Sequence, residues 1–436
     1  MVAQLSAPKA VSQNRTLVLW LLTFVYMFSL VDRQIIGILS PIIKAELGFS
    51  DSQLGWLKGF AFALLYTTVG IPLAWLADRF NRVRIVGLSL ILWSAFTALT
   101  GSAHTFTAML MARIGVGVGE AGGTPPSHSI ISDLYPKEQR SSALGIYALG
   151  VPLGITLSFI VGAIFVERFG WRGTLHGLGG AGILFAFVVL YFIKEPVRGQ
   201  LETASEIKSE PIPLLESFAT LRKIPSWWGM CLGMASVSFA GYAVAAWGTD
   251  YLFRFDPDYI AGTEGSKFSQ YMLVMAAIHF FGLGAGTYLG GYFADRWSRS
   301  NVSGYAYVCA IAAALCGPLL VAAFWMSSVP AMLVCLGLYV AISGMWVAPC
   351  FAAAQTLVPV KMRAMSTAVF FLVLNLIALG GGPTIIGLVS EALIPKHGEL
   401  MALRLALTSL GAVFVLGFGF FLWAAKHLPN DWPKDS

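Results

Sequence analysis

The sequence has few charged residues. Only 11% of its 436 residues are Asp, Glu, Lys or Arg, whereas a soluble globular protein carries about 25%. Hydrophobic residues make up 57%, and the mean hydropathy is +0.74. Water cannot solvate a surface of this composition over such a length. The composition therefore excludes a soluble protein and indicates a membrane protein with several spans.

Cysteine is absent from the first half of the chain. The five cysteines are an odd number, they include no CxxC pair, and they lie in apolar runs, at Cys231, Cys309, Cys316, Cys335 and Cys350. We interpret them as small buried apolar residues. The sequence therefore predicts no disulfide framework, no metal site and no cofactor.

The net charge of +6 does not indicate a nucleic-acid-binding protein. The basic residues lie in short connections between apolar runs, where they set membrane topology. The sequence also lacks the signature of a cleavable signal peptide, because the first apolar run continues past Asp32 and Arg33 without a small-residue cleavage site. We therefore expect no nucleic-acid partner, and the lipid bilayer as the surroundings of the chain.

Long apolar runs dominate the sequence. A helix needs about 20 residues to cross a bilayer, and runs of this length exclude a membrane β-barrel, whose strands show as alternating segments of about ten residues. We predict an all-α integral membrane protein with twelve transmembrane helices, at about 17–39, 54–77, 84–103, 107–131, 141–165, 173–193, 228–252, 270–293, 304–326, 330–354, 364–389 and 402–425.

The distribution of Lys and Arg predicts the orientation of the spans. With both termini in the cytoplasm, eighteen of the 28 Lys and Arg residues fall on the cytoplasmic side and eight on the other, while Arg33 and Arg113 lie within spans. Basic residues are enriched in cytoplasmic loops. We therefore expect a multi-pass membrane protein with both termini cytoplasmic, in the cell (inner) membrane if it is bacterial.

A repeat divides the chain into two halves. "WLADRFNR" (75–82) follows the second span and "YFADRWSR" (292–299) follows the eighth, half the chain later. The longest charged break lies between the sixth and seventh spans. We therefore predict a six-helix bundle at 1–193, a cytoplasmic linker at 194–226 and a second six-helix bundle at 227–436. Substrate sites of such duplicated proteins lie between the halves, near the bilayer midplane.

These two loop motifs, "RIGVGVGEAGG" (113–123) and the Gly-rich stretch at 145–154 resemble the major facilitator superfamily over essentially the whole chain. The resemblance implies the major facilitator fold, alternating access and a monomeric protein. The loop motif of that superfamily usually has Gly where this chain has Ala74 and Asn81, whereas the second copy keeps Gly291.

"ADRFNR", the Asp-Arg pair of the first span and "GVGEA" followed by "SDLYP" resemble the Spinster-like branch more narrowly. That branch is associated with lysophospholipid and sphingosine-phosphate transport in animals. Residues 1–39 also resemble anion:cation symporters of organic acids, which share the Asp-Arg pair.

Four charges lie well inside predicted spans, away from the last few residues at either end, at Asp32, Arg33, Arg113 and Glu120. At 1.5 Å per residue, Asp32 is about 22 Å from the cytoplasmic face and Arg113 about 9 Å from the opposite face. The two depths match in a core about 30 Å thick, so we expect this carboxylate and guanidinium to pair. Glu120 follows Arg113 by seven residues, which is nearly two helical turns, so both lie on almost the same face of the helix. Arg33 is rotated by about 100° from its neighbour and faces either the same cavity or the membrane surface.

Two interpretations of these four charges remain open. They form a static salt bridge between the first and fourth spans, or a switchable network. In the switchable network a proton on Asp32 or Glu120 releases Arg113 to bind an anionic group. The resemblance to the Spinster-like branch implies that the matching residues are functionally central. We therefore take Asp32, Arg33, Arg113 and Glu120 as candidate substrate-binding and proton-coupling residues.

Polar residues are scarce in the spans of the second half, where the exceptions are His279, Gln355, Asn375 and Glu391. An ionic first half facing an apolar second half suits a substrate with an anionic head and a hydrocarbon tail. We predict a secondary active transporter that works by alternating access, coupled to protons, for a lysophospholipid or sphingosine-phosphate-like lipid. The alternative is a proton-coupled symporter of a small organic anion, hexuronate-like or aromatic.

The repeated loop motifs have two interpretations as well. Their arginines set topology, but the acidic residues add nothing to that signal and suggest a specific cationic acceptor. In the superfamily the matching residues form a cytoplasmic latch that closes the outward-facing state. The resemblance thus implies a cytoplasmic gate made of Asp78, Arg79, Arg82, Asp295, Arg296 and Arg299.

Other classes of protein fit the sequence less well. We find no Ser/His/Asp or metal-ligand cluster and no Walker loop, so we do not predict an enzyme. A channel requires a continuously lined pore, whereas two repeats around an ionic network favour alternating access. A receptor or scaffold remains an alternative, although no loop indicates a partner-binding module.

Overall fold

The computed structural model describes residues 13–199, 201, 219–260, 266–359 and 362–433. Within these ranges the chain is helical and contains no β-strand. The apolar runs form helices because a helix satisfies all of its backbone hydrogen bonds within one segment, which the bilayer core requires.

The helices before the predicted linker begin with a long, proline-containing first helix. In chain order they are α1 (Arg15–Leu47), α2 (Asp51–Lys58), α3 (Phe60–Ala77), α4 (Arg82–Gly101), α5 (Phe106–Glu120), α6 (Thr124–Leu134), α7 (Lys137–Ala148) and α8 (Gly150–Phe192).

The helices after the predicted linker include two π-helical segments and two short 3₁₀ turns. In chain order they are α11 (Pro225–Phe255), η1 (Pro257–Tyr259), α12 (Phe268–Ala277), the π-helix η2 (Ile278–Leu283), α13 (Gly284–Ser298), α14 (Gly304–Trp325), α15 (Val329–Ser343), η3 (Gly344–Trp346), α16 (Val347–Thr356), α17 (Arg363–Leu374), the π-helix η5 (Asn375–Gly381), α18 (Gly382–Thr408) and α19 (Leu410–Asp431).

The helices account for the twelve predicted spans. Nine helical segments of the described ranges are long and apolar enough to cross a membrane. Two of them, Ser142–Phe192 and Met365–Asp431, are too long for one crossing, and each is kinked at a glycine with positive φ, Gly170 at 65° and Gly398 at 75°. Helices α5 and α6 add one crossing that is broken after Glu120. The prediction of an all-α membrane protein with twelve spans is confirmed.

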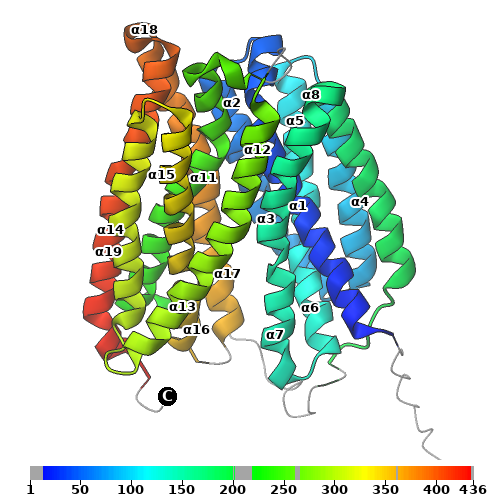
Figure 1. The fold of residues 1–436 in the computed structure, drawn as a ribbon. Helices are drawn as coiled ribbons and strands as arrows, with labels where there is room; N and C mark the ends of the chain where they lie inside the picture. The colour runs from blue at the N-terminus through cyan, green and yellow to red at the C-terminus, as the bar shows by residue number, and fades with distance from the viewer. Residues whose placement is uncertain (1–12, 200, 202–218, 261–265, 360–361, 434–436) are drawn as a thin grey trace, which may run out of the picture.

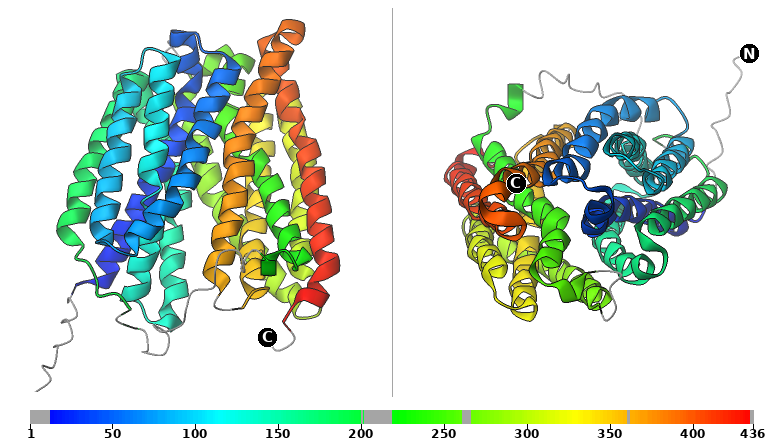
Figure 2. Two further views of the ribbon diagram at one scale, coloured as in Figure 1. Left: turned by 180° about the vertical axis from the view of Figure 1, so that it is seen from behind. Right: turned by 90° about the horizontal axis from the view of Figure 1, so that it is seen from above.

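The helices form two groups that lie side by side, α1–α8 (the N-half) and α11–α19 (the C-half), as Figures 1 and 2 show. Helix α1 begins and α19 ends at one end of the molecule, here called the termini end; the opposite end carries α2 and is called the α2 end (Figure 1). The ribbons of the two halves converge at the α2 end and diverge toward the termini end. The predicted linker at 194–226 stays a prediction, because residues 200 and 202–218 lie outside the described ranges.

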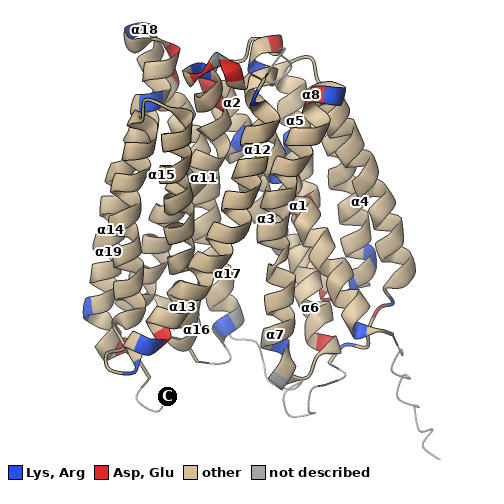
Figure 3. Ribbon diagram, in the orientation of Figure 1, with Lys and Arg blue, Asp and Glu red and all other residues tan. Residues whose placement is uncertain are grey.

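The two halves approach each other closely at the α2 end. Gly59 separates α2 from α3, and a Cβ atom added there would lie 2.5 Å from both the carbonyl oxygen of Gly380 and the hydroxyl of Thr384. The Thr384 hydroxyl accepts a hydrogen bond from the amide of Phe60 at 3.1 Å and donates to the carbonyl of Gly55 at 3.1 Å. A side chain at position 59 would therefore force the halves apart. Figure 3 shows that charged residues gather at the two ends of the bundle and are few between them.

Candidate functional site

The four charges predicted within spans lie on two helices of the N-half. Helix α1 carries Asp32 and Arg33, and α5 carries Arg113 and Glu120. Helix α5 ends at Glu120, and the break before α6 follows directly. Asp32, Arg113 and Glu120 are each at most 4% exposed. The structure thus brings all four residues into one buried cluster, here called the central cluster.

Arg33 and Glu120 form the ion pair of the central cluster. The Arg33 Nε donates to Glu120 Oε2 at 2.7 Å, and the two side chains are 12% and 0% exposed. The Arg33 guanidinium also lies 4.4 Å from the ring centroid of Tyr66 and 5.0 Å from that of Phe62. Arg33 therefore faces the interior of the N-half, which answers the question that its rotation from Asp32 left open.

Arg113 contacts the backbone of Asp32 rather than its carboxylate. An Arg113 Nη donates to the carbonyl oxygen of Asp32 at 3.5 Å, whereas the ion pairs of the described residues, defined within 4.0 Å, include none for either side chain. This differs from the expected carboxylate–guanidinium pair. The matching depths of Asp32 and Arg113 place the two residues close together. The rotation of each helix about its axis, however, decides which carboxylate meets which guanidinium. In the structure, Glu120 meets Arg33.

Two polar atoms of the central cluster are buried and have no hydrogen-bond partner in the structure. They are Arg113 Nε and Glu120 Oε1. Native proteins pair about nine in ten of their buried polar groups. An unpaired guanidinium nitrogen and an unpaired carboxylate oxygen in one buried cluster can each accept a polar ligand or water as a partner, and the carboxylate can also accept a proton.

Aromatic residues surround the central cluster and were missed by the sequence analysis. Tyr26 stacks on Tyr147 at 4.9 Å between ring centroids, with the planes 1° apart, and the ring of His128 lies edge-on to Tyr147 at 5.1 Å. Tyr26, Tyr66 and Tyr242 of the C-half keep accessible surface, whereas Tyr147 is buried. A phenol within an apolar span is the sequence signal that could have found these residues.

A second group of buried charges, at the α2 end, joins the two halves and was also missed. The Lys58 ammonium lies 2.7 Å from Asp250 Oδ2, and both side chains are 1% exposed. Nearer the end of the molecule, Arg254 donates two hydrogen bonds to Asp51, at 2.6 and 2.9 Å. Asp250 is not among the polar residues that the sequence analysis counted in the spans of the second half, and the structure adds it to them. Lys58 and Asp250 lie inside the predicted spans 54–77 and 228–252, and this placement was the available signal.

The six predicted gate residues lie at the termini end without ion pairs to one another among the described residues. Asp78, Arg79, Asp295, Arg296 and Arg299 are exposed. The Arg79 guanidinium lies 3.9 Å from the ring centroid of Trp75, and Asp295 accepts a hydrogen bond from the hydroxyl of Tyr305 at 3.3 Å. Each of these contacts stays within one half.

Arg82 differs from the other gate residues because it is 1% exposed. Its guanidinium binds Asp133 of α6, the Glu195 carboxylate at 2.7 Å and the Pro196 carbonyl at 2.9 Å. It therefore ties the start of α4 to the segment after α8. Arg198 of the same segment donates to the carbonyls of Ala77 and Phe80 at the end of α3, where a cation is favourable.

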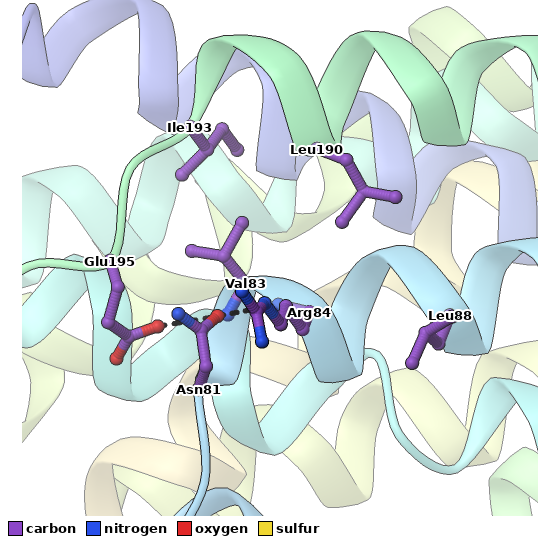
Figure 4. A pocket seen from close by; sticks show the side chains of 7 residues that line it. All are labelled: Asn81, Val83, Arg84, Leu88, Leu190, Ile193 and Glu195. Atoms are coloured by element: carbon purple, nitrogen blue, oxygen red, sulfur yellow. Dashed lines mark hydrogen bonds between the residues drawn. The ribbon is translucent and has the colours of Figure 1, made fainter.

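A pocket of about 360 Å³ lies at the termini end of α4 and α8, away from the central cluster (Figure 4). Its lining combines apolar side chains with Asn81, Arg84 and Glu195, and the Glu195 carboxylate accepts from the backbone amide of Val83 at 3.1 Å. None of the four charges of the central cluster lines it. We place the candidate site at the central cluster instead, because the unpaired buried charges lie there.

A helical membrane protein of two halves, with a charged cluster inside one of them, has the architecture of a secondary transporter. The model of the Major Facilitator Superfamily matches residues 22–383. The chain therefore belongs to the Major Facilitator Superfamily, and it is a transporter rather than an enzyme.

Three similar proteins match nearly the whole chain. An MFS-type efflux pump of Mycolicibacterium smegmatis is 29% identical over 409 residues, covering 93% of this chain and 91% of the relative. Protein spinster homolog 1 of Xenopus laevis is 25% identical, covering 97% and 83%. The crystal structure of a bacterial homolog of the human lysosomal transporter Spinster, inward-facing and unoccupied, has a TM-score of 0.85 with 26% identity, covering 97% and 99%. The resemblance to the Spinster-like branch is thereby confirmed.

Proposed function

We propose that this protein moves an amphipathic anion across the membrane by alternating access, coupled to protons, with the anionic head bound at Arg113. The observation that carries the proposal is that Arg113 is 2% exposed and has no carboxylate within 4.0 Å among the described residues. A buried guanidinium without a counter-ion is unfavourable. A phosphate or carboxylate of a substrate would supply both the charge and the bidentate hydrogen bonds that Arg favours.

Asp32 is the proposed site of proton coupling. Its side chain is buried, and no cation lies within 4.0 Å of its carboxylate in the described part of the chain. A carboxylate buried without a cation is most stable when it holds a proton. When substrate occupies Arg113 or water enters the space between the halves, the balance between the charged and the neutral form changes, and this couples the proton to the substrate.

Glu120 and Arg33 complete the proposed exchange of partners. Glu120 holds Arg33 through one carboxylate oxygen, while its other oxygen has no hydrogen-bond partner. A proton on Glu120 would weaken the Arg33 pair and free a second guanidinium for the substrate head. The pair is thus the resting state of a network that a proton rearranges.

The hydrocarbon tail of the substrate is proposed to lie against the C-half. Tyr66 of the N-half lies 4.4 Å from the Arg33 guanidinium, and Tyr26 of the N-half and Tyr242 of the C-half interact electrostatically with Arg33. All three keep accessible surface. Aromatic rings bury apolar area and offer a hydroxyl to a polar head. Lysophospholipids and sphingosine phosphates combine these requirements, in accord with the resemblance to the Spinster-like branch.

We further propose that both termini are cytoplasmic, so that the α2 end faces outward and this structure is inward-facing. The excess of Lys and Arg at the termini end supports this orientation. The gate residues Asp78, Arg79, Asp295, Arg296 and Arg299 would then meet only when the termini end closes. Arg82, held within the N-half, would position α4 for that contact. The protein is proposed to act as a monomer.

Binding to purified protein tests the proposal. Sphingosine phosphate and a lysophospholipid are titrated by calorimetry against wild type, Arg113→Gln and the control Arg168→Gln, whose residue is exposed. A hydrogen bond to a charged group contributes about 1.5–3 kcal/mol, so Arg113→Gln should raise Kd about tenfold to a hundredfold. Equal affinity of Arg113→Gln and wild type would contradict the proposed head site. Binding of a hexuronate but of neither lipid would replace the lipid by a small organic anion.

A further inference from the structure

The α2 end is held closed by an ion pair in which both side chains are buried, whereas each ion pair nearer the rim has at least one partner that is 10% exposed or more. Lys58 of α2 and Asp250 of α11 come from different halves, and each side chain is 1% exposed. The hydroxyl of Ser40 in α1 donates to the same carboxylate oxygen at 2.5 Å. Three helices, two from the N-half and one from the C-half, therefore meet at one oxygen atom.

An aromatic ring lies against the lysine of this pair. The Lys58 ammonium lies 3.7 Å from the ring centroid of Trp247, one turn before Asp250 on α11, and a cation over an indole face is attracted to it. The Trp247 ring is itself fixed, because its Nε1 donates to the carbonyl of Pro383 at 2.9 Å. The second carboxylate oxygen of Asp250 is buried and has no partner in the structure.

A second ionic layer lies nearer the rim. Asp51, at the start of α2, binds Arg254, one turn beyond Asp250 on α11. It also binds the Lys44 ammonium at 2.9 Å, and Lys44 reaches Glu399 of α18 at 3.0 Å. Glu399 is 57% exposed. The rim layer is therefore partly hydrated, whereas the Lys58 layer beneath it is not.

A buried ion pair is a poor way to make a permanent contact. Removing two charges from water costs several kcal/mol per ion, and well-packed apolar residues of similar volume hold helices together equally well or better. The pair has a different property: when the α2 end opens, both charges regain water. The attraction between Lys58 and Asp250 favours the closed state, and hydration of the two charges favours the open state. Apolar side chains in their place would resist opening, because opening would expose them to water.

We propose that Lys58, Asp250 and Ser40 form a releasable lock that closes the α2 end, and that they are positioning residues for transport. The lock goes beyond the substrate and proton site and rests on the proposed alternating access only for its role in the cycle. It holds the halves together while the termini end is open and separates when the termini end closes. Its partners lie on different halves, so rigid-body rotation of the halves must break it.

Distances between spin labels test the lock without any substrate. Labels are placed at Thr107→Cys in α5 and Lys396→Cys in α18, both exposed positions at the α2 end, in a variant whose five cysteines are replaced by alanine. Breaking a buried pair by removing one partner is strongly unfavourable, so Lys58→Gln and Asp250→Asn should each raise the ratio of open to closed populations at least about tenfold. Because the two residues act through each other, the double variant should open no further than the single ones.

Glu46→Gln is the matched control. It removes an ion pair of 2.8 Å between Glu46 and Arg172 at the same end, but both residues belong to the N-half. Its distance distribution should equal that of wild type. Distributions of Lys58→Gln and Asp250→Asn that also equal wild type, or effects that add in the double variant, would overturn the lock.

Ser40→Ala keeps both charges and serves if neither charge variant yields a monodisperse protein. Losing one hydrogen bond to a charged group should raise the ratio of open to closed populations at least about tenfold, and an unchanged distribution overturns the lock. Failure of lipid binding in the calorimetric test leaves these distances unaffected. The lock and the proposed function can therefore fail separately.

Discussion

The two groups of buried charges differ in where their partners lie. In the central cluster Arg33 pairs with Glu120 and Arg113 contacts Asp32, all within the N-half. At the α2 end Lys58 pairs with Asp250, and the ion pair crosses from one half to the other. Both groups are buried, and both use one acidic and one basic residue at hydrogen-bond distance.

This difference suggests separate roles for the two groups, one in binding ligands and the other in the movement of the two halves. When the halves rotate as rigid bodies, contacts within one half persist, while contacts between halves must break. In the proposed mechanism the central cluster can therefore respond to a proton or an anion in every conformation, whereas the pair at the α2 end forms only when that end is closed. The proposed transport cycle requires that the state of the central cluster bias the closure of the α2 end.

The largest effect is expected for Asp32→Asn, which removes the proposed proton site and leaves the shape of the side chain. Because asparagine cannot release a proton, accumulation of substrate driven by a pH gradient should be lost. Binding of the anion should persist, since Arg113 is unchanged. Uptake into proteoliposomes with and without a pH gradient measures the first, and calorimetry the second.

Asp258→Asn is the control for that experiment. Asp258 is 62% exposed and, among the described residues, forms an ion pair only with Lys267 of the same half, so gradient-driven uptake should match wild type. Accumulation by Asp32→Asn at the wild-type level would place the proton elsewhere and would leave the central cluster as a static contact between α1 and α5.

The sequence predicted the helices of the central cluster but not its pairing. Helix rise and bilayer thickness set the depth of each charge, and Asp32 and Arg113 do meet at one depth. Rotation about the helix axis depends on packing with neighbours, such as the rings of Phe62 and Tyr66 against Arg33. Sequence periodicity does not contain that information. Only the structure therefore shows that Glu120 pairs with Arg33, and that Arg113 does not pair with the carboxylate of Asp32.

The lock at the α2 end was missed for another reason. Lys58 was counted as a residue that sets topology, because it lies near the start of a span. Its burial depends on the short helix α2, which ends at Lys58 just before Gly59 and places the lysine beneath the rim. A charge within the first or last five residues of a span is therefore ambiguous from sequence. The matching Asp250 near the end of another span was the feature that could have resolved it.

An intermediate effect is expected when the aromatic support of the central cluster is removed. In Tyr66→Leu the Arg33 guanidinium loses the ring that lies 4.4 Å away. A cation–π contact contributes about 0.5–2 kcal/mol, so initial transport rates should fall about two- to thirtyfold. Tyr66→Phe keeps the ring and should stay close to wild type. A similar loss in both variants would assign the effect to the hydroxyl and not to the ring.

The smallest effect is expected at the rim of the α2 end, with Glu399→Gln. Exposed ion pairs contribute about 0–1 kcal/mol, so the ratio of open to closed populations should change less than about fivefold. The Debye length falls to about 3 Å in 1 M salt, and the difference from wild type should vanish there. The same pair of spin labels, measured at low and high salt, gives both numbers.

Asp250→Asn should keep its effect at high salt, because water and ions do not reach a pair that is 1% exposed. A rim variant that opens the α2 end as far as Asp250→Asn does would place the lock at the surface and not beneath it.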